Sequence, residues 1–203
     1  MAVHSDASLA FVVSAAADGC VRVWALRSHE MMLQFCEHQK PVTQVLVDVK
    51  QPHLVHSCGT DCAVFTYDLR RERRTVAHMV REGQFTTMSQ RFDSEQELVT
   101  ADNNGKLMFW DCDIDEAVAT VRSPLPVSCL QVSPSGRFFA IAGDYTVMVY
   151  DTATVGGPQC EPIAAGIGHS GKVNALVWSP DERQLVSVGD DSCVSVWNFF
   201  GAM

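Results

Sequence analysis

Apolar and polar residues alternate in short runs along most of the chain. Near the C-terminal end, Val173, Ala175 and Val177 recur at every second position. Successive side chains of a strand point to opposite faces of a sheet, so this period of two predicts β-strands with one packed face. Turn-forming residues, Pro180 and Gly189 among them, separate the runs. The pattern therefore favours many short strands over long helices.

Each group of predicted strands closes on an aromatic residue. These closing residues are Trp24, Tyr67, Trp110, Tyr150 and Trp197. They lie 43, 43, 40 and 47 residues apart, and an alternating apolar strand precedes each of them. A single aromatic closure would carry little information, but this near-constant spacing indicates an internal repeat.

The last repeat unit is the most complete one. It opens with Gly168-His169 and ends with Trp197-Asn198. A Gly-His opening and a Trp-Asp ending about 40 to 45 residues apart, with four strands in each unit, form the signature of WD repeats. On these residues the chain resembles the WD40 β-propeller family. The resemblance implies an all-β fold built from propeller blades.

The resemblance also implies how the chain is divided. We expect residues 1–203 to form one partial WD40 β-propeller of about four and a half four-stranded blades. The residues up to Ser8 are too few to supply two further strands of the first unit, and the expected whole is the C-terminal part of a larger propeller. Its missing blades would come from upstream sequence or from a partner chain. The expected units are a half blade over residues 8–25 and blades over 31–68, 75–111, 117–151 and 160–198.

Blades of this family often contain a buried hydrogen-bonded tetrad. It consists of the His of Gly-His, a Ser or Thr of an inner strand, the turn Asp and the closing Trp. Buried polar groups must satisfy one another, since an unpaired one costs roughly 1–3 kcal/mol. Because the set recurs between units, we interpret it as structural and not as a catalytic triad. By position, the members are His169, Ser187, Asp191 and Trp197 in the last unit, His38, Ser57, Asp61 and Tyr67 in the second, and Ser14, Asp18 and Trp24 in the first.

The other two units depart further from this pattern. The third keeps Thr100 and Trp110, has Asn104 in place of the turn Asp, and has no His. The fourth has lost the set, and its turn at Gly143 is one residue shorter. We therefore expect the tetrad to be complete only in the last unit.

The composition fits a globular chain. Of the 203 residues, 47% are hydrophobic, and the formal net charge is −9 at pH 7. No apolar stretch is long enough to span a membrane as a helix. Nucleic-acid affinity rests on clustered Lys and Arg residues that release counterions from phosphates, and the acidic balance argues against it. We therefore expect neither a membrane nor a nucleic acid as a partner.

The N-terminus and the cysteines bear on the compartment. Residues 1–6 lack a basic start followed by a long apolar run, so no secretory signal is predicted and a cytoplasmic location is expected. Cysteines of such a chain are expected to be reduced core and strand residues, since disulfides suit an oxidising compartment. The eight cysteines are Cys20, Cys36, Cys58, Cys62, Cys112, Cys129, Cys160 and Cys193.

No residue pattern indicates a metal, a cofactor or a catalytic site. His53, His56, Cys58 and Cys62 suggest zinc by residue type, but side chains on a strand alternate between faces and cannot easily converge on one centre. A Gly-rich phosphate loop, a nucleophile elbow and a His-Glu-x-x-His motif are all missing from the sequence. We expect a chain that is not an enzyme and has no metal or cofactor.

One basic cluster interrupts the acidic composition. Arg70, Arg71, Arg73 and Arg74 lie in the connector after the second closing aromatic residue. This cluster could be a solvated linker that pairs with nearby acids. Guanidinium groups also bind carboxylates through two parallel hydrogen bonds. Our functional interpretation is therefore that the four arginines dock on an acidic protein, such as the tubulin surface.

Several short strings resemble WD-repeat proteins of cilia, flagella and centrioles. They are Thr66 to Arg74, Asp93 to Thr100, Phe109 to Asp113 and Val196 to Phe200. This resemblance implies a non-catalytic protein–protein interaction scaffold of the cytoskeleton, located in a cilium, flagellum or basal body. Tubulin and axonemal or centriolar proteins are the implied partners. The alternative is a WD40 adaptor subunit of a ubiquitin, RNA-processing or trafficking complex.

Overall fold

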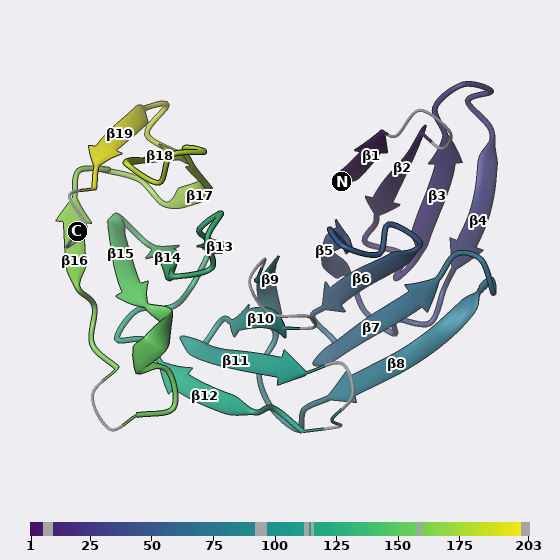
Figure 1. The fold of residues 1–203 in the computed structure, drawn as a ribbon, viewed down its shortest axis with the longest axis horizontal. Coiled ribbons are helices and arrows are strands. Elements are labelled where there is room, and N and C mark those ends of the chain that lie inside the picture. Colours follow the sequence, from purple (N-terminus) through teal and green to yellow (C-terminus); the bar gives the residue numbers. More distant parts are fainter. Residues whose placement is uncertain (6–9, 92–96, 112–113, 115, 158–159, 200–203) are drawn as a thin grey trace. The chain divides into compact units, whose positions relative to one another are not determined.

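The computed structural model describes residues 1–5, 10–91, 97–111, 114, 116–157 and 160–199. These residues form nineteen β-strands and one short 3₁₀-helix, η1 (Thr152–Thr154), with no α-helix among them. The strands make five antiparallel sheets (Figure 1). The prediction of an all-β chain of blade-like sheets is confirmed. Within the described ranges, no helix has the length and apolar character needed to cross a bilayer.

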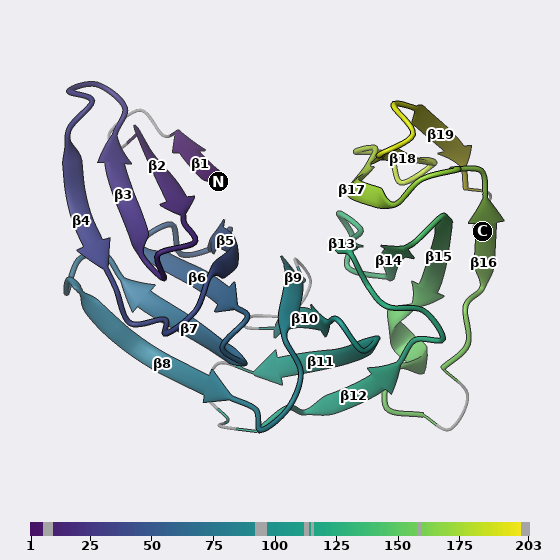
Figure 2. The same cartoon turned by 180° about the vertical axis from the view of Figure 1, so that it is seen from behind.

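The chain divides into two compact units, Met1–Met88 and Ser89–Met203. By colour, the first unit runs from purple to blue and the second from teal to yellow, as can be followed from both sides (Figures 1 and 2). Strand β9 (Phe85–Gln90) contains residues of both units.

The first unit contains two four-stranded sheets. Alternate residues of both sheets meet in one apolar core, which includes Phe11, Val23, Val45 and Tyr67. This packing uses the period of two seen in the sequence, because only one set of alternating side chains points into the core. The strands are β1 (Ala2–Ser5), β2 (Ala10–Ala15), β3 (Val21–Ala25) and β4 (Met31–Phe35) in one sheet, and β5 (Val42–Val47), β6 (Leu54–Gly59), β7 (Ala63–Asp68) and β8 (Arg73–Met79) in the other.

The second unit packs its sheets in two apolar layers. In one layer, side chains such as Phe109 and Phe139 join the third and fourth sheets. In the other layer, side chains such as Val149 and Leu185 join the fourth and fifth sheets. The strands are β10 (Glu97–Asp102), β11 (Lys106–Asp111) and β12 (Ala119–Arg122), with β9, in the third sheet; β13 (Cys129–Val132), β14 (Phe138–Gly143), β15 (Thr146–Asp151) and β16 (Ala164–Ile167) in the fourth; and β17 (Val173–Trp178), β18 (Gln184–Gly189) and β19 (Val194–Asn198) in the fifth.

The sheets group the strands differently from the predicted repeat units. The first sheet has four strands where residues 8–25 predict two, because β1 pairs with β2 and β4 pairs with β3. Likewise β8, β12 and β16 pair with the strand that carries the preceding closing aromatic residue. Each outer strand therefore belongs to the sheet before its predicted unit, since the antiparallel ladder and not the sequence period decides sheet membership. The fifth sheet has three strands among the described residues.

A disulfide joins Cys20 and Cys36. The pairing of Val21 with Phe35 across β3 and β4 places the flanking cysteines opposite one another, with their Cα atoms 4.2 Å apart. The expectation of reduced cysteines is wrong for this pair. Cys112 lies outside the described residues, and the remaining cysteines, Cys58, Cys62, Cys129, Cys160 and Cys193, are free thiols.

Candidate functional site

A continuous chain of hydrogen bonds links the four predicted residues of the fifth sheet. The indole Nε1–H of Trp197 on β19 donates to Oγ of Ser187 on β18 at 2.7 Å. His169, which precedes β17, has its Nε2 atom 2.7 Å from the same hydroxyl. Its Nδ1 atom lies 3.0 Å from Oδ2 of Asp191 in the β18–β19 turn. This hydrogen-bonded network links the segment before β17 and the last strand, β19, to the central strand, β18.

When the His169 ring is neutral, every polar hydrogen of this hydrogen-bonded network has an acceptor. With the proton on Nδ1, the ring donates to Asp191, and Nε2 accepts from the Ser187 hydroxyl. The carboxylate of Asp191 also accepts from the backbone N–H groups of Ser170 at 2.9 Å and Cys193 at 3.1 Å. The bond from Ser170 is the main cause that holds the pKa of Asp191 below its usual range, and the bond from Cys193 adds to it. The carboxylate thus stays ionised over the physiological pH range.

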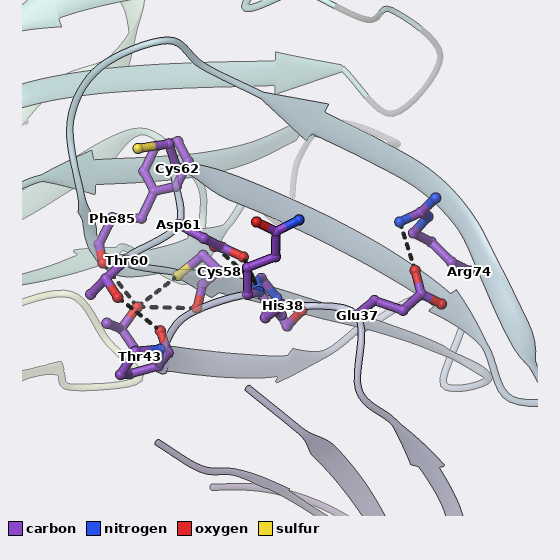
Figure 3. Close-up of polar contacts among 12 residues, drawn as sticks. Glu37, His38, Thr43, Cys58, Thr60, Asp61, Cys62, Arg74 and Phe85 are labelled. Carbon is purple, nitrogen blue, oxygen red and sulfur yellow. Dashed lines mark hydrogen bonds and ion pairs between the residues drawn. The ribbon is translucent and has the colours of Figure 1, made fainter. Parts of the chain in front are cut away.

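The second sheet repeats this geometry. His38 Nε2 lies 2.7 Å from Ser57 Oγ, and His38 Nδ1 lies 2.9 Å from Asp61 Oδ2. The backbone N–H of Gln39 donates to the same carboxylate at 3.0 Å. Figure 3 shows His38 and Asp61 meeting beside the strands of this sheet. Tyr67 occupies the place of the tryptophan, and its buried hydroxyl makes no hydrogen bond within the described residues; burial raises the pKa of this phenol.

Two glycines, Gly189 and Gly59, make room for the His–Asp pairs. A Cβ added to Gly189 would lie 2.9 Å from His169 Nδ1, and one added to Gly59 would lie 2.8 Å from His38 Nδ1. Both distances are shorter than a carbon–nitrogen contact allows. The glycines are therefore part of the networks, because a side chain would displace the imidazole.

The first sheet joins only two of its three predicted residues. Trp24 Nε1–H donates to Ser14 Oγ at 2.9 Å. Asp18 instead pairs with Arg22, whose Nη2 lies 2.6 Å from Asp18 Oδ2, and its side chain is 51% exposed. The hydrogen bond from Arg22 is the main cause that lowers the pKa of Asp18. The expected membership of Asp18 in a buried network is therefore wrong, because its carboxylate is exposed and bound to Arg22.

The third sheet keeps one bond of the network. Trp110 Nε1–H donates to Thr100 Oγ1 at 2.8 Å, and both residues are buried. In its turn, the backbone N–H groups of Asn104 and Lys106 donate to Asp102 Oδ1, each at 2.8 Å. In the fourth sheet, burial of Tyr150 raises the pKa of its phenol. The network is therefore complete in the fifth sheet and lacks the tryptophan bond in the second. In the first and third sheets, the bond from the tryptophan to Ser14 or Thr100 is the part that is kept.

A further buried network lies in the second sheet and is not among the predicted sites. His56 Nδ1 lies 2.9 Å from Thr66 Oγ1, and His56 Nε2 lies 3.2 Å from Asp48 Oδ2. All three side chains are buried. His56 is adjacent to Ser57 on β6, so the two side chains point to opposite faces of the sheet. Alternation along β6 separates His56 from Ser57, but no signal in the sequence identifies Asp48 as the partner of His56.

The residues considered for zinc are used elsewhere. Cys58 is fully buried beside the Thr43 hydroxyl, which lies 3.4 Å from its sulfur, and burial raises the pKa of the thiol to about 12. Cys62 donates to the carbonyl of Gly83. Metal ligation needs a thiolate. Among the described residues, no group of three or more His, Cys, Asp or Glu side chains is placed to hold a metal ion.

Arg74 is bound within the protein. Its Nη1 atom lies 2.6 Å from Glu37 Oε2, and its guanidinium lies 4.9 Å from the centre of the Phe65 ring. Figure 3 shows Arg74 extending from β8 towards Glu37. A guanidinium held by a carboxylate and a ring has little freedom to bind a second acid. Arg74 therefore differs from the other three arginines of the predicted cluster.

Arg70 and Arg71 lie in the exposed turn between β7 and β8, and Arg73 is the exposed first residue of β8. Arg71 is 66% exposed, and its Nε lies 3.5 Å from Oδ2 of Asp68. Among the described residues, Arg70 and Arg73 have no ion-pair partner for their side chains. We name Arg70, Arg71 and Arg73 the arginine turn.

The repeats match a known family. The sequence profile described as "WD domain, G-beta repeat" matches residues 1–25, 116–151 and 160–198. The chain carries WD40 repeats. Residues 26–115 lie outside the matched ranges. Even so, His38, Ser57 and Asp61 in that stretch have the same hydrogen-bonded geometry as their counterparts in the fifth sheet.

Three curated relatives illustrate the similarity. Cilia- and flagella-associated protein 52 of Sus scrofa is 24% identical over 203 residues, which cover 98% of this chain and 32% of the relative. Pre-mRNA-processing factor 17 of Homo sapiens is 24% identical over 172 residues, or 80% of this chain and 28% of the relative. WD repeat-containing protein 1 of Gallus gallus is 36% identical over 73 residues, or 36% of this chain and 12% of the relative. The chain thus spans about a third or less of the length of these relatives.

Proposed function

We propose that this chain is part of a non-catalytic scaffold that binds other proteins in a cilium or flagellum, on or beside microtubules. WD40 repeats present binding surfaces in many pathways, so the fold supports a scaffold but not a particular partner. The observation that carries the ciliary proposal is the alignment over 98% of the chain with a protein named as cilia- and flagella-associated. The cytoskeleton of a cilium, flagellum or basal body is the location that this proposal implies.

The arginine turn is the surface that we assign to partner binding. Its three guanidinium groups project from an exposed hairpin of a chain whose net charge is −9. A basic site attracts an acidic partner, and the acidic surface around it repels that partner. An acidic partner is therefore directed to the basic site. The acidic surface of tubulin fits this requirement. Arg74 is left out of the proposed surface because Glu37 and Phe65 already hold it.

Co-pelleting with taxol-stabilised microtubules tests the proposal. We expect the parent chain to pellet, and the variant Arg70→Glu/Arg71→Glu/Arg73→Glu to stay in the supernatant. The matched control is Arg27→Glu/Arg81→Glu/Arg183→Glu, which makes the same charge change at exposed positions elsewhere. The control should pellet almost as well as the parent, and pelleting should weaken as salt rises. A parent that never pellets, or two variants that pellet equally, would refute the arginine turn as a microtubule site.

The second candidate is an adaptor of an RNA-processing complex. It is supported by the match to Pre-mRNA-processing factor 17 over 80% of the chain. An adaptor of this kind should stay in the supernatant with microtubules at moderate salt. Co-precipitation of the chain with spliceosomal proteins and not with axonemal proteins would favour this candidate over the first.

A further inference from the structure

An open pocket of about 400 Å³ lies in the second unit, away from the hydrogen-bonded networks. Three segments distant in sequence form it: the residue after β9, the turn between β13 and β14, and the segment that follows β15, the strands labelled in Figure 2. Ligand pockets commonly measure about 300–1,000 Å³. The lining residues include Arg91, Ser135, Gly136, Arg137, Asp151 and Thr152.

The turn between β13 and β14 is held in place on one side of the pocket. Thr152 binds it twice, because its backbone N–H donates to the carbonyl of Arg137 and its hydroxyl donates to the carbonyl of Gly136, both at 2.8 Å. Gly136 has a φ of 76°, a left-handed conformation that favours glycine. The backbone N–H of Arg137 donates to Ser135 Oγ at 3.2 Å. This wall of the pocket is therefore formed before any ligand binds.

Two arginines line the pocket in a chain whose net charge is −9. The guanidinium of Arg137 lies 4.9 Å from the centre of the Phe138 ring. A guanidinium stacked on a ring keeps the N–H groups at its edge for hydrogen bonds in its own plane. Each guanidinium carries five N–H donors, so a contact within the protein leaves donors for a ligand.

The nearby acids are bound to donors of the protein. Asp151 Oδ1 accepts from the backbone N–H of Ala153 at 2.9 Å. Glu182, from the turn between β17 and β18, accepts from the Ser135 hydroxyl at 2.8 Å and from the Ser135 backbone N–H. Among the residues that line the pocket, two guanidinium groups face one carboxylate. The lining therefore favours an anion.

We propose that this pocket binds a phosphoryl group through Arg91 and Arg137. One guanidinium fork already satisfies both oxygens of a carboxylate, whereas a phosphoryl group has three oxygens and can accept from two forks. A phosphorylated side chain of a partner protein and a free phosphate compound both present this group. The pocket shares no residue with the arginine turn, so the proposal does not depend on microtubule binding.

Isothermal titration calorimetry with inorganic phosphate at low ionic strength tests the proposal. We expect the parent chain to bind phosphate more tightly than acetate, and added sodium chloride to weaken the binding. Arg91→Gln and Arg137→Gln each remove one fork and should each weaken phosphate binding by about tenfold or more. The control Arg27→Gln/Arg81→Gln, at exposed positions of the first unit, should bind phosphate like the parent.

Asp151→Asn should change the affinity in the opposite direction. Asparagine keeps an acceptor for the Ala153 N–H but removes the negative charge from the pocket lining. Phosphate should therefore bind more tightly to this variant than to the parent. A gain in affinity cannot come from unfolding, so this variant separates the charge of the pocket from the stability of the chain.

A short peptide with one phosphoserine distinguishes the two sources of the phosphoryl group. If the peptide binds at least as tightly as inorganic phosphate and its unphosphorylated form does not bind, a phosphorylated partner is the ligand. If inorganic phosphate binds and the peptide does not, a free phosphate compound is the ligand. A parent chain that binds no phosphate, or Arg91→Gln and Arg137→Gln variants that bind it like the parent, would overturn the proposal.

Discussion

The Nε2 atom of His169 lies 2.7 Å from Oγ of Ser187, and the same distance separates His38 Nε2 from Ser57 Oγ in another sheet. In both sheets an aspartate holds the other ring nitrogen, and a glycine leaves space for the ring. The same hydrogen-bonded arrangement therefore occurs in two sheets. The fifth sheet lies within the matched WD40 ranges, and the second sheet lies outside them. We propose that these networks stabilise their sheets and take no part in chemistry.

Replacing Ser187 with alanine tests this structural role. The change leaves the buried Nε2 of His169 and the indole N–H of Trp197 without a partner. We expect the free energy of unfolding to fall by about 1–3 kcal/mol, measured by urea denaturation. Ser195 lies opposite Ser187 on β19, and Ser195→Ala is the control, with an expected change within about 0.5 kcal/mol. Equal losses in the two variants would contradict the network's role.

Acid should weaken the chain partly through Asp191. The folded state lowers the pKa of this carboxyl, mainly through the bond from the Ser170 backbone. The unfolded value is about 3.9, so its contribution is complete above that pH and is lost as pH falls towards the folded pKa. Urea midpoints measured from neutral pH down to about pH 3 should fall for the parent and fall less for Asp191→Asn. Identical pH profiles would show that Asp191 contributes nothing to acid stability.

Part of this acid dependence should survive in Asp191→Asn. The pKa values of Asp18, Asp68 and Asp181 are also lowered in the folded chain. Each of these carboxyls adds stability that is lost in the same direction, because the folded state binds its proton less tightly than the unfolded state. The variant should therefore show a smaller slope and not a flat profile.

The strands follow from the sequence because their signals are local. The alternation in Val173–Trp178 and the turn at Gly189 predict β17 and the end of β18. The packed face predicted for β17 is wrong, because a bulge after Val173 leaves Ala175 and Val177 exposed and buries Leu176 and Trp178 instead. The grouping of strands into sheets does not follow, since it depends on hydrogen bonds to residues outside the repeat. Met31–Phe35 precedes the second repeat unit but pairs with β3 of the first sheet. Pairing of this kind leaves no trace in the spacing of aromatic residues.

The candidate site shows the same division between local and distant information. The WD40 resemblance places His169 and Ser187 by position, and the structure brings them together. It fails at Asp18, because Arg22 binds that carboxylate. Likewise, the sequence alone groups Arg74 with its neighbours, because Glu37, its ion-pair partner, is distant in the sequence. Competing partners of this kind become visible only when the strands are folded together.

Gly189→Ala should destabilise the fifth sheet. Its new methyl group would lie 2.9 Å from His169 Nδ1 and 3.1 Å from the carbonyl of Lys172. Overpacking of this kind costs about 1–3 kcal/mol, and we expect that loss in urea denaturation. Gly59→Ala, which approaches His38 in the same way, should lose a similar amount. A Gly189→Ala variant as stable as the parent would mean that the imidazole is not held against this turn.

Reduction of the Cys20–Cys36 disulfide should weaken the first sheet. The bridge closes a loop between residues 16 apart in sequence, and a loop of this size corresponds to about 3 kcal/mol of unfolding free energy. We therefore expect a lower urea midpoint in the presence of a reductant, and the same midpoint for Cys20→Ser/Cys36→Ser with or without it. Cys193→Ser is the control, since Cys193 is an exposed free thiol. Its midpoint should respond to the reductant as the parent's does. Alkylation of the unreduced, unfolded chain, followed by mass measurement, should leave Cys20 and Cys36 unmodified, and labelling of both would contradict the bridge.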